Sequence, residues 1–206
     1  MEKIYFYKLT ADSNAAPCIH YGLLSLAICK PMIRKTAKEG NLIIGFAANS
    51  LHDDNRLIFA ARVTRKLTDG DYFKTKKYFR RGDCIYSFRN MRFTWRKDAK
   101  FHSPADLTHD LGDHPDYDRA SVLLSEDFRY FGKDGNDKYK TKFPRVKCAV
   151  ENLGRGHRVR HGPAVRDQLL EMMDELWRTY STRVIGRPTG AAPRETCYRD
   201  GECGEA

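Results

Sequence analysis

Apolar residues in this chain fall into short blocks of strand length that are separated by polar turns. Residues 3–10 (KIYFYKLT) alternate in part and are rich in aromatic side chains, which is typical of a strand. Residues 41–50 and 56–67 each contain a continuous apolar run, and the polar segment between them is short, so two buried neighbouring strands are predicted. Strand character returns over residues 83–97 and again over residues 119–132, where either a strand pair or one strand with a turn at residues 125–127 is expected.

Three segments have the pattern of helices. Residues 31–40 begin with proline and end with glycine, which suit the first turn and the end of a short helix. Residues 69–83 are predicted to contain a second short helix. Residues 101–119 show no sustained period, so a loop is expected there. The clearest helix covers residues 163–180, whose apolar residues recur at helical spacing: Val165, Leu169, Met172, Met173, Leu176, Trp177 and Tyr180.

These elements do not alternate regularly between strand and helix, which argues against a parallel doubly wound sheet. The pattern predicts an α+β fold, a compact mixed domain with a curved or barrel-like sheet, flanked by short helices and a C-terminal amphipathic helix. Residues 1–185 are expected to form a single globular domain. Residues 186–206 contain Gly, Pro and charge with little to bury, and are predicted to be a disordered tail.

The charge balance favours a polyanionic partner, either nucleic acid or an anionic membrane surface. The chain has 206 residues, with 37 Lys and Arg against 27 Asp and Glu, and a formal net charge of +10. No apolar run approaches the about 20 residues that span a bilayer, and the first residues lack the order of a signal peptide. A soluble, cytoplasmic monomer is therefore expected.

The six cysteines do not have the spacing of a zinc site and are interpreted as reduced thiols. Cys29, Cys84 and Cys148 each lie in an apolar stretch and are interpreted as small buried hydrophobic residues. No metal or organic cofactor is expected.

Basic and aromatic residues interleave over residues 80–97, and a second basic cluster surrounds the sequence GRGHR at residues 154–158. Cations neutralise phosphates, and an aromatic face stacks on an unpaired base for about 1–3 kcal/mol. The alternatives are an ordinary half-buried strand in the first segment and a solvated basic turn in the second. The predicted nucleic-acid-binding residues are Arg34, Tyr86, Phe88, Arg89, Trp95, Arg155 and Arg158.

Several polar residues stand at the ends of predicted strands, where a catalytic group is often found. A carboxylate that positions water is the main requirement for hydrolysis of an N-glycosidic bond. Lys30 lies in an apolar setting, so it is a candidate amine nucleophile, although it can also be paired with a carboxylate. An Asp in a turn commonly bonds only its own backbone. The predicted catalytic residues are Asp12, Lys30, Asn49, Asp127 and His157.

The segments LSLAICKPMIRKTAKEG, LIIGFAAN, SVLLSEDFRYFG and GRGHR, in that order, resemble the family of nucleotide-modification-associated domains. The resemblance covers residues 4–180 and is most specific at LSLAICKPMIR. It implies a PUA-like or EVE-like pseudo-barrel that binds RNA or modified DNA bases. It also implies a setting of hypermodified phage DNA, in which such proteins read modified bases, help to make them or remove them. No catalytic set is transferred from the family.

The function expected from these observations is recognition of a hypermodified base in double-stranded DNA by base flipping, followed by glycosylase cleavage that leaves an abasic site. The DNA expected is phage DNA with modified cytosine or thymine, and the setting is phage defence. The alternatives are a non-catalytic reader of modified bases, an accessory protein of base modification, and a PUA-like protein that binds RNA.

Overall fold

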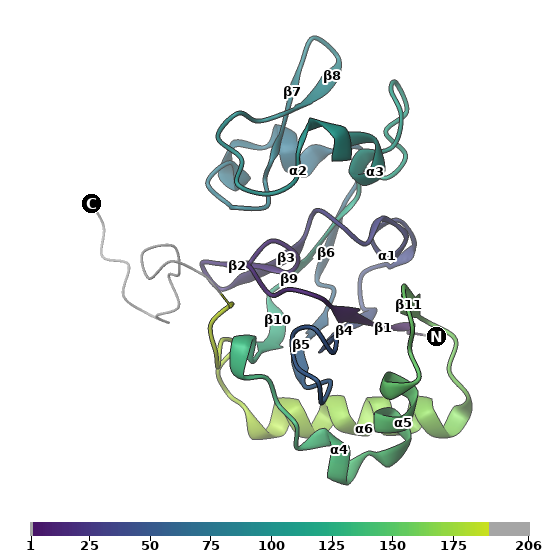
Figure 1. The fold of residues 1–206 in the computed structure, drawn as a ribbon. Coiled ribbons are helices and arrows are strands. Elements are labelled where there is room, and N and C mark those ends of the chain that lie inside the picture. Colours follow the sequence, from purple (N-terminus) through teal and green to yellow (C-terminus); the bar gives the residue numbers. More distant parts are fainter. Residues whose placement is uncertain (1, 190–206) are drawn as a thin grey trace.

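The structure is a computed structural model that describes residues 2–189, and Figure 1 shows these residues stacked in layers. A helical layer lies at one end of the stack. A larger sheet, a smaller sheet and a separate lobe follow in that order. The helical layer consists of α4 (Tyr139–Lys142), α5 (Pro144–Glu151) and α6 (Pro163–Thr179).

The larger sheet has five strands in the order β10-β5-β4-β1-β11. Strands β1 and β4 run parallel, and the other neighbours run antiparallel. A short helix, α1 (Pro31–Thr36), directly precedes β4 along the chain. The strands of the larger sheet are β1 (Ile4–Leu9), β4 (Leu42–Ala47), β5 (Leu57–Arg62), β10 (Asp127–Tyr130) and β11 (His157–Arg158).

The smaller sheet is antiparallel, with the order β2-β3-β9-β6. Its last two strands are neighbours, with Leu67 opposite Val122, although 54 residues separate them in the sequence as residues 68–121. These residues form the lobe at the top of Figure 1, called here the inserted region. The strands of the smaller sheet are β2 (Cys18–His20), β3 (Leu23–Leu26), β6 (Arg65–Leu67) and β9 (Val122–Ser125).

The inserted region combines a hairpin with short helical segments. Outside the inserted region, a further 3-10 turn at Gly132–Asp134 follows β10. The elements of the inserted region are α2 (Asp71–Lys74), a 3-10 turn (Lys76–Tyr78), β7 (Tyr86–Arg89), β8 (Arg92–Trp95), a 3-10 turn (Pro104–Asp106) and α3 (Leu107–Leu111).

Side-chain alternation along β1 explains why the layers stack. Successive side chains of a strand point to opposite faces. Ile4 and Phe6 pack on the helical layer, whereas Tyr5 and Tyr7 pack toward the smaller sheet. A third apolar cluster joins the far face of the smaller sheet to the inserted region. The helical layer is held mainly by α6, which buries Leu169, Met172, Met173 and Leu176.

The mixed α+β class and the pairing of residues 41–50 with residues 56–67 are confirmed, because β4 and β5 are antiparallel neighbours. The barrel-like sheet is not formed: among the described strands, β10 and β11 remain open edges of the larger sheet. Residues 119–132 do not form a strand pair but follow the other alternative, a strand interrupted at residues 125–127, since β9 and β10 belong to different sheets. Residues 101–119 contain helical turns rather than a loop alone, and α5 was not predicted.

Two residues assigned to the predicted tail, Gly186 and Arg187, are bonded to the domain instead. The backbone N–H of Gly186 donates to the carbonyl of Tyr130, and the carbonyl of Arg187 accepts from Lys133. The remainder of the predicted tail, residues 190–206, lies outside the described residues. Over residues 2–189, no helix has the length and apolar character needed to cross a bilayer.

Candidate active site

Cys29 lies in a tight turn between β3 and α1. Cys29 and Lys30 both have left-handed backbone conformations, with φ values of 56° and 42°. Such a conformation costs on the order of 1–3 kcal/mol for a residue with a side chain, and it persists where the surroundings hold it in place. The turn leaves the thiol of Cys29 half-buried, neither enclosed in the core nor freely exposed.

The thiol of Cys29 meets an imidazole from the inserted region. Its Sγ lies 3.3 Å from Nε2 of His102. On the other side of the ring, Nδ1 of His102 donates to Oδ2 of Asp110 at 2.7 Å. The Asp110 side chain is fully buried, whereas that of His102 is 21% exposed. This is the order of groups in which a base takes the proton of a nucleophile while a buried acid orients the base.

Asp110 is held from several sides. Its Oδ1 accepts from the backbone N–H of Cys29, and its Oδ2 accepts from the hydroxyl of Tyr86, both at 2.8 Å. The buried guanidinium of Arg34 lies 3.6 Å from Oδ1. The same guanidinium ties the thiol turn to the inserted region, because it donates to the carbonyl groups of Cys29, Asp110, Arg119 and Ser121.

These contacts set the charges of the site. The hydrogen bond to Asp110, followed by the contact with Cys29, raises the pKa of His102 to about 10 against the effect of burial. Burial raises the pKa of Asp110, but the bonds from His102 and Tyr86 and the charge of Arg34 outweigh it, so this pKa lies below its ordinary value. His102 is therefore an imidazolium at neutral pH. A cysteine beside an imidazolium is the usual arrangement of a nucleophilic thiol.

Two of the predicted catalytic residues, Lys30 and His157, both lie near Tyr7, and Lys30 directly follows Cys29 in the chain. The Nζ of Lys30 lies 4.7 Å from the centre of the Tyr7 ring. Tyr7 and His157 are directly opposite each other on β1 and β11. Burial lowers the pKa of Lys30, with the charge of Cys29 opposing it, and burial together with the charge of Lys30 lowers the pKa of His157.

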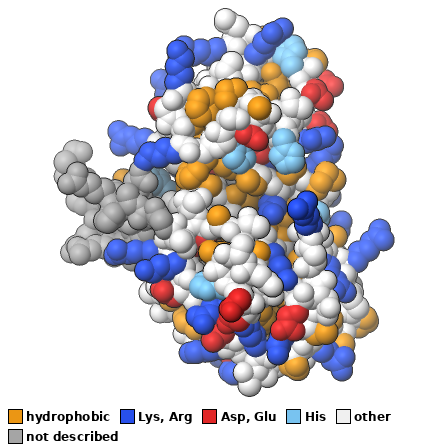
Figure 2. All heavy atoms as spheres, in the orientation of Figure 1, with side chains coloured by type: hydrophobic (Ala, Val, Ile, Leu, Met, Phe, Trp, Pro, Cys, Tyr) orange, Lys and Arg blue, Asp and Glu red, His pale blue; other side chains and the backbone are white. Residues whose placement is uncertain are grey.

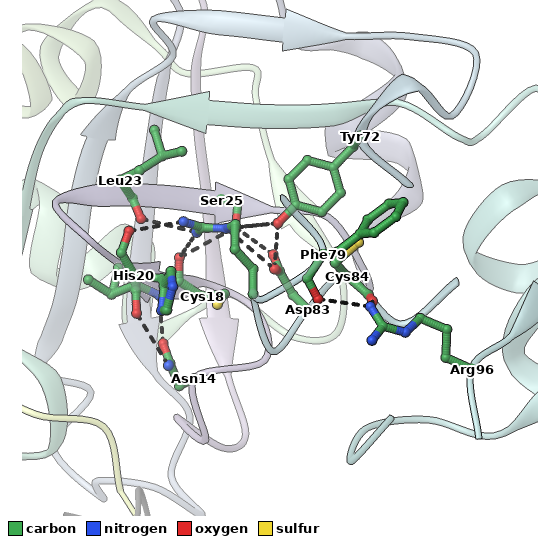
Figure 3. A network of polar contacts seen from close by, with 12 residues as sticks. Asn14, Cys18, His20, Leu23, Ser25, Tyr72, Phe79, Asp83, Cys84 and Arg96 are labelled. Atoms are coloured by element: carbon green, nitrogen blue, oxygen red, sulfur yellow. Dashed lines mark hydrogen bonds and ion pairs between the residues drawn. The ribbon is translucent and has the colours of Figure 1, made fainter. Parts of the chain in front are cut away.

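A second buried carboxylate, Asp83, occupies a comparable network (Figure 3). Tyr72 donates to its Oδ1 at 2.6 Å, and Ser25 donates to its Oδ2. Arg81 lies 3.7 Å from the carboxylate, with the two side chains only 2% and 0% exposed. Burial, more than any other effect, raises the pKa of Asp83. Arg81 also donates to Tyr72, Ser25 and the carbonyl groups of Cys18, His20 and Leu23.

A cavity of about 540 Å³ lies beside this second network. Its volume falls in the range of small-molecule sites. The rings of Phe79 and Phe101 line it, together with the exposed cations Arg80 and Lys100. Phe101 directly precedes His102, so the cavity and the thiol site share one stretch of chain.

The other predicted catalytic residues have local roles. Asp12 is 2% exposed, and its Oδ2 accepts from the hydroxyl of Tyr130 at 2.7 Å. Burial raises the pKa of Asp12 to about 6. Asp127 accepts from Trp177 and pairs with Arg62 at the edge of the larger sheet. Asn49 accepts a hydrogen bond from Asn55 in a surface loop.

Two predicted nucleic-acid-binding residues are wrong, because Arg34 and Tyr86 are both 0% exposed. Their polar groups hold Asp110 and the neighbouring carbonyls instead. Trp95 is half-buried, and its Nε1 donates to the carbonyl of Phe101 at 3.1 Å. Phe88 is also half-buried, with the ammonium of Lys74 4.8 Å from its ring centre.

The predicted arginines of the two basic segments differ in their exposure. Arg89 in the hairpin of the inserted region and Arg155 in the GRGHR turn are exposed, as predicted for residues that meet phosphates. Arg158 is half-buried, and its Nε donates to the carbonyl of Arg160. In Figure 2 histidine and hydrophobic side chains gather where the inserted region meets the rest of the molecule, with Lys and Arg around them.

Cys29, His102 and Asp110 were not predicted from the sequence as functional residues. Cys29 was interpreted as a buried hydrophobic residue, and the segment of His102 and Asp110 was interpreted as a loop. The interpretation of Cys148 is also wrong, since its side chain is exposed, whereas Cys84 is buried as predicted. Within residues 2–189, no group of three or more His, Cys, Asp or Glu side chains is placed to hold a metal ion.

Comparison with known proteins gives one match. The family model described as nucleotide modification associated domain 2 matches residues 1–194. Neither the curated proteins nor the solved structures include a significant match to the chain.

Proposed function

Because the chain belongs to the nucleotide modification associated domain 2 family, we propose that it is a thiol-dependent enzyme that acts on modified nucleotides, with Cys29 as the nucleophile. The family gives the chain a role related to modified nucleotides. The observation that carries the enzymatic part is the 3.3 Å approach of the Cys29 sulfur to His102, whose other nitrogen is bonded to the buried Asp110.

Each of the three residues has a distinct part in this proposal. Cys29 supplies the attacking sulfur. His102, as an imidazolium, gives a proton at Nε2 to the leaving group and takes one back in the later step, and Asp110 fixes the orientation of the ring. Arg34 and Tyr86 are positioning residues, since they hold the Asp110 carboxylate and do not touch the thiol.

The cavity next to Phe101 is the proposed position of the nucleotide. Its two phenylalanine rings offer faces for stacking, and Arg80 and Lys100 offer positive charge for phosphate. A base that enters this cavity from double-stranded DNA has to leave its stack, at a cost of a few kcal/mol. Base flipping therefore remains part of the proposal.

Selective alkylation of the thiol tests the proposal. The full chain is treated with iodoacetamide at about pH 6.5, where an ordinary thiol is only about 1% thiolate, and the labelled cysteines are read by peptide mass spectrometry. Cys29 is expected to react at least about tenfold faster than Cys148, although Cys148 is the more exposed of the two. The variant His102→Gln is expected to remove this advantage.

Faster labelling of Cys148 than of Cys29 contradicts the proposal. The corresponding test on nucleic acid uses phage DNA with modified cytosine, digested to nucleosides after incubation with protein. A change in mass of the modified nucleoside with the natural chain, and none with Cys29→Ser, supports the proposal. No change with either protein at high enzyme concentration contradicts activity on that base.

A DNA glycosylase in phage defence is the second candidate, and the position of Lys30 is the observation that favours it. Its half-buried ammonium has no hydrogen-bond acceptor among residues 2–189, and burial lowers its pKa. An amine in such a setting is suited to attack the sugar carbon and displace the base. Borohydride in the reaction then traps a covalent complex of protein and DNA.

The two candidates differ in which residue the trapping requires. A borohydride adduct that is lost in Lys30→Met and kept in Cys29→Ser supports the glycosylase. Absence of the adduct and of abasic sites, together with a gel shift on modified DNA, favours a non-catalytic reader. A preference for structured RNA over DNA in competition binding favours the RNA-binding alternative.

A further inference from the structure

The geometry around Cys29 restricts where an oxyanion can be stabilised. In a thiol or serine enzyme of acyl transfer, the backbone N–H of the nucleophile commonly donates to the oxyanion. Here the backbone N–H of Cys29 already donates to Oδ1 of Asp110 at 2.8 Å. An oxyanion formed at this sulfur therefore needs donors from other residues.

Lys30 is placed to be one such donor. It follows Cys29 directly, and the left-handed turn at both residues directs its ammonium over the ring of Tyr7, 4.7 Å from the ring centre. No described residue offers a hydrogen-bond acceptor or a carboxylate to this ammonium, so its N–H groups are available to a ligand.

The hydroxyl of Tyr7 is the second candidate donor. Tyr7 is 0% exposed, and its Oη has no hydrogen-bond partner in residues 2–189. A buried hydroxyl without a partner costs about 1–3 kcal/mol, so its retention points to a ligand that satisfies it. Burial, and then the charges of Cys29 and Asp12, raise the pKa of Tyr7, which keeps the hydroxyl protonated and able to donate.

The relay of His102 indicates which reaction takes place at the sulfur. When a thiolate adds to C6 of a pyrimidine ring, the sulfur itself is later expelled and the proton is needed at C5. When a thiolate attacks a carbonyl, the group that leaves is an amine or alcohol, and it needs a proton from an acid beside the sulfur. The imidazolium of His102, within hydrogen-bond distance of the sulfur, serves this second reaction.

We infer that Cys29 cleaves an acyl group from a nucleotide whose base carries an acylated amine, with Lys30 and Tyr7 as the oxyanion donors. The inference rests on the proposed function and names its substrate class. In the first step the sulfur bonds to the carbonyl carbon, the carbon–nitrogen bond breaks, and the proton passes through His102 to the leaving amine. In the second step water attacks the thioester, its proton passes to His102, and the thiol and a carboxylic acid are released.

Two reagents that modify the same sulfur separate this inference from the proposed function. Acetylation of Cys29 by p-nitrophenyl acetate passes through an oxyanion, whereas alkylation by iodoacetamide does not. Loss of one oxyanion donor costs about 100- to 1,000-fold in acylation rate. Lys30→Met is thus expected to slow acetylation about 100-fold more than it slows alkylation, and Lys30→Arg is expected to restore part of the rate.

Two further variants exclude indirect effects. Lys38→Met removes an exposed lysine just beyond α1 and is expected to change neither rate. Tyr7→Phe removes a hydroxyl that has no described partner, so it is expected to preserve stability while it slows acetylation. An oligonucleotide with N4-acetylcytosine then tests the substrate class, with conversion to cytosine expected for the natural chain and not for Cys29→Ser.

The outcomes are distinguishable. Selective alkylation of Cys29 without acetylation, or equal slowing of both reactions in Lys30→Met, overturns the acyl-transfer inference and leaves the proposed thiol enzyme in place. A covalent adduct of Cys29 with a 5-fluorocytosine oligonucleotide also overturns it, in favour of addition at C6. Failure of both reagents to select Cys29 removes the proposed function as well.

Discussion

Two buried carboxylates, Asp110 and Asp83, anchor the inserted region to the rest of the molecule, and their surroundings differ in one respect. Each has an arginine within 4 Å, at 3.6 Å and 3.7 Å, and each accepts a hydrogen bond from a buried tyrosine. The other oxygen of Asp83 accepts from the hydroxyl of Ser25, and the other oxygen of Asp110 accepts from the backbone N–H of Cys29. Asp110 alone also accepts from His102, a ring that reaches both solvent and a thiol.

Each network also has a cysteine beside it, which makes the contrast sharper. Cys18 lies next to Asp83 and is 1% exposed, and burial raises the pKa of its thiol well above the ordinary value. Cys29 is half-buried and has an imidazolium in contact. A buried Arg–Asp–Tyr unit therefore holds the structure together at both places. The accessible His102 makes the unit around Asp110 a candidate active site.

The largest effect that we expect is a loss of folding stability when Asp83 is substituted. Asp83→Asn leaves the enclosed charge of Arg81 without its partner, and loss of one member of a buried ion pair costs about 3–5 kcal/mol. Urea unfolding followed by circular dichroism measures this loss. Asp53→Asn, which changes an exposed carboxylate, is the control. Alkylation of Cys29 in the folded fraction is expected to be unchanged, and a large drop there would mean that the two networks are not separate.

Asp110→Asn is expected to lower both the folding stability and the alkylation rate of Cys29. Arg34 keeps its four carbonyl acceptors, so the loss of stability is smaller, about 2–3 kcal/mol. The rate of Cys29 alkylation at about pH 6.5 is expected to fall about 10- to 100-fold, because His102 loses the group that keeps it charged and oriented. Unchanged alkylation would assign Asp110 a structural role alone.

The pair of His102 and Asp110 also makes the stability of the fold depend on pH. The pKa of His102 is raised to about 10, so its contribution to stability is complete below about pH 6.5 and is lost as the pH rises through about 10. The pKa of Asp110 is lowered, so its contribution is present above the ordinary range of an Asp and is lost as the pH falls. The difference in Tm between the natural chain and Asp110→Asn is therefore expected to be greatest near neutral pH and to narrow at both extremes.

Asp12 sharpens the comparison because it is a buried carboxylate without an arginine. Burial raises its folded-state pKa to about 6, so the ionised form is disfavoured on folding and stability falls as the pH rises through about 6. Asp12→Asn removes this penalty and is expected to stabilise the protein by about 2 kcal/mol at about pH 8, with little effect at about pH 4. Thermal melts at the two pH values measure it, and destabilisation at the higher pH would show that the carboxylate is needed in its charged form.

The smallest effect is expected from arginines that lie outside both networks. Arg89→Ala and Arg155→Ala each remove an exposed cation, so stability is expected to stay within about 0.5 kcal/mol. Each is expected to weaken DNA binding modestly and to reduce the slope of log affinity against log salt by about one. Fluorescence anisotropy at several salt concentrations measures the slope, and an unchanged slope in both variants would place the DNA on another surface.

The elements of the scaffold were predictable from sequence where local pattern and tertiary environment agree. The apolar runs of β4 and β5 and the helical spacing of α6 are examples, since each element buries the face that its own pattern marks. The choice between the two alternatives for residues 119–132 was not predictable, because a strand that changes sheets between Ser125 and Asp127 has the same local pattern as a hairpin.

The candidate site was predictable only in part, for a related reason. Lys30 and His157 stood out by residue type, and the structure places Lys30 beside Cys29 and both residues near Tyr7. The partners of Cys29 lie 73 and 81 residues away in the sequence, in a stretch without any period. Arg34 and Tyr86 were assigned to the surface because charge and aromatic character are ambiguous, and burial beside Asp110 decided their role.

The insertion point between β6 and β9 determines which part of the chain supplies each residue of the proposed active site. Leu67 and Val122 face each other across one rung of the ladder, so a tight turn in place of residues 68–121 would convert the two strands into an ordinary hairpin. Such a deletion would remove both the base and its orienting acid in one event while leaving the sulfur on the scaffold, although it would uncover the apolar side of the smaller sheet. The proposed nucleophile and its proton carrier thus come from separate parts of the chain, and a shortened chain of this kind would also lose the Phe79 and Phe101 side of the cavity proposed for the nucleotide.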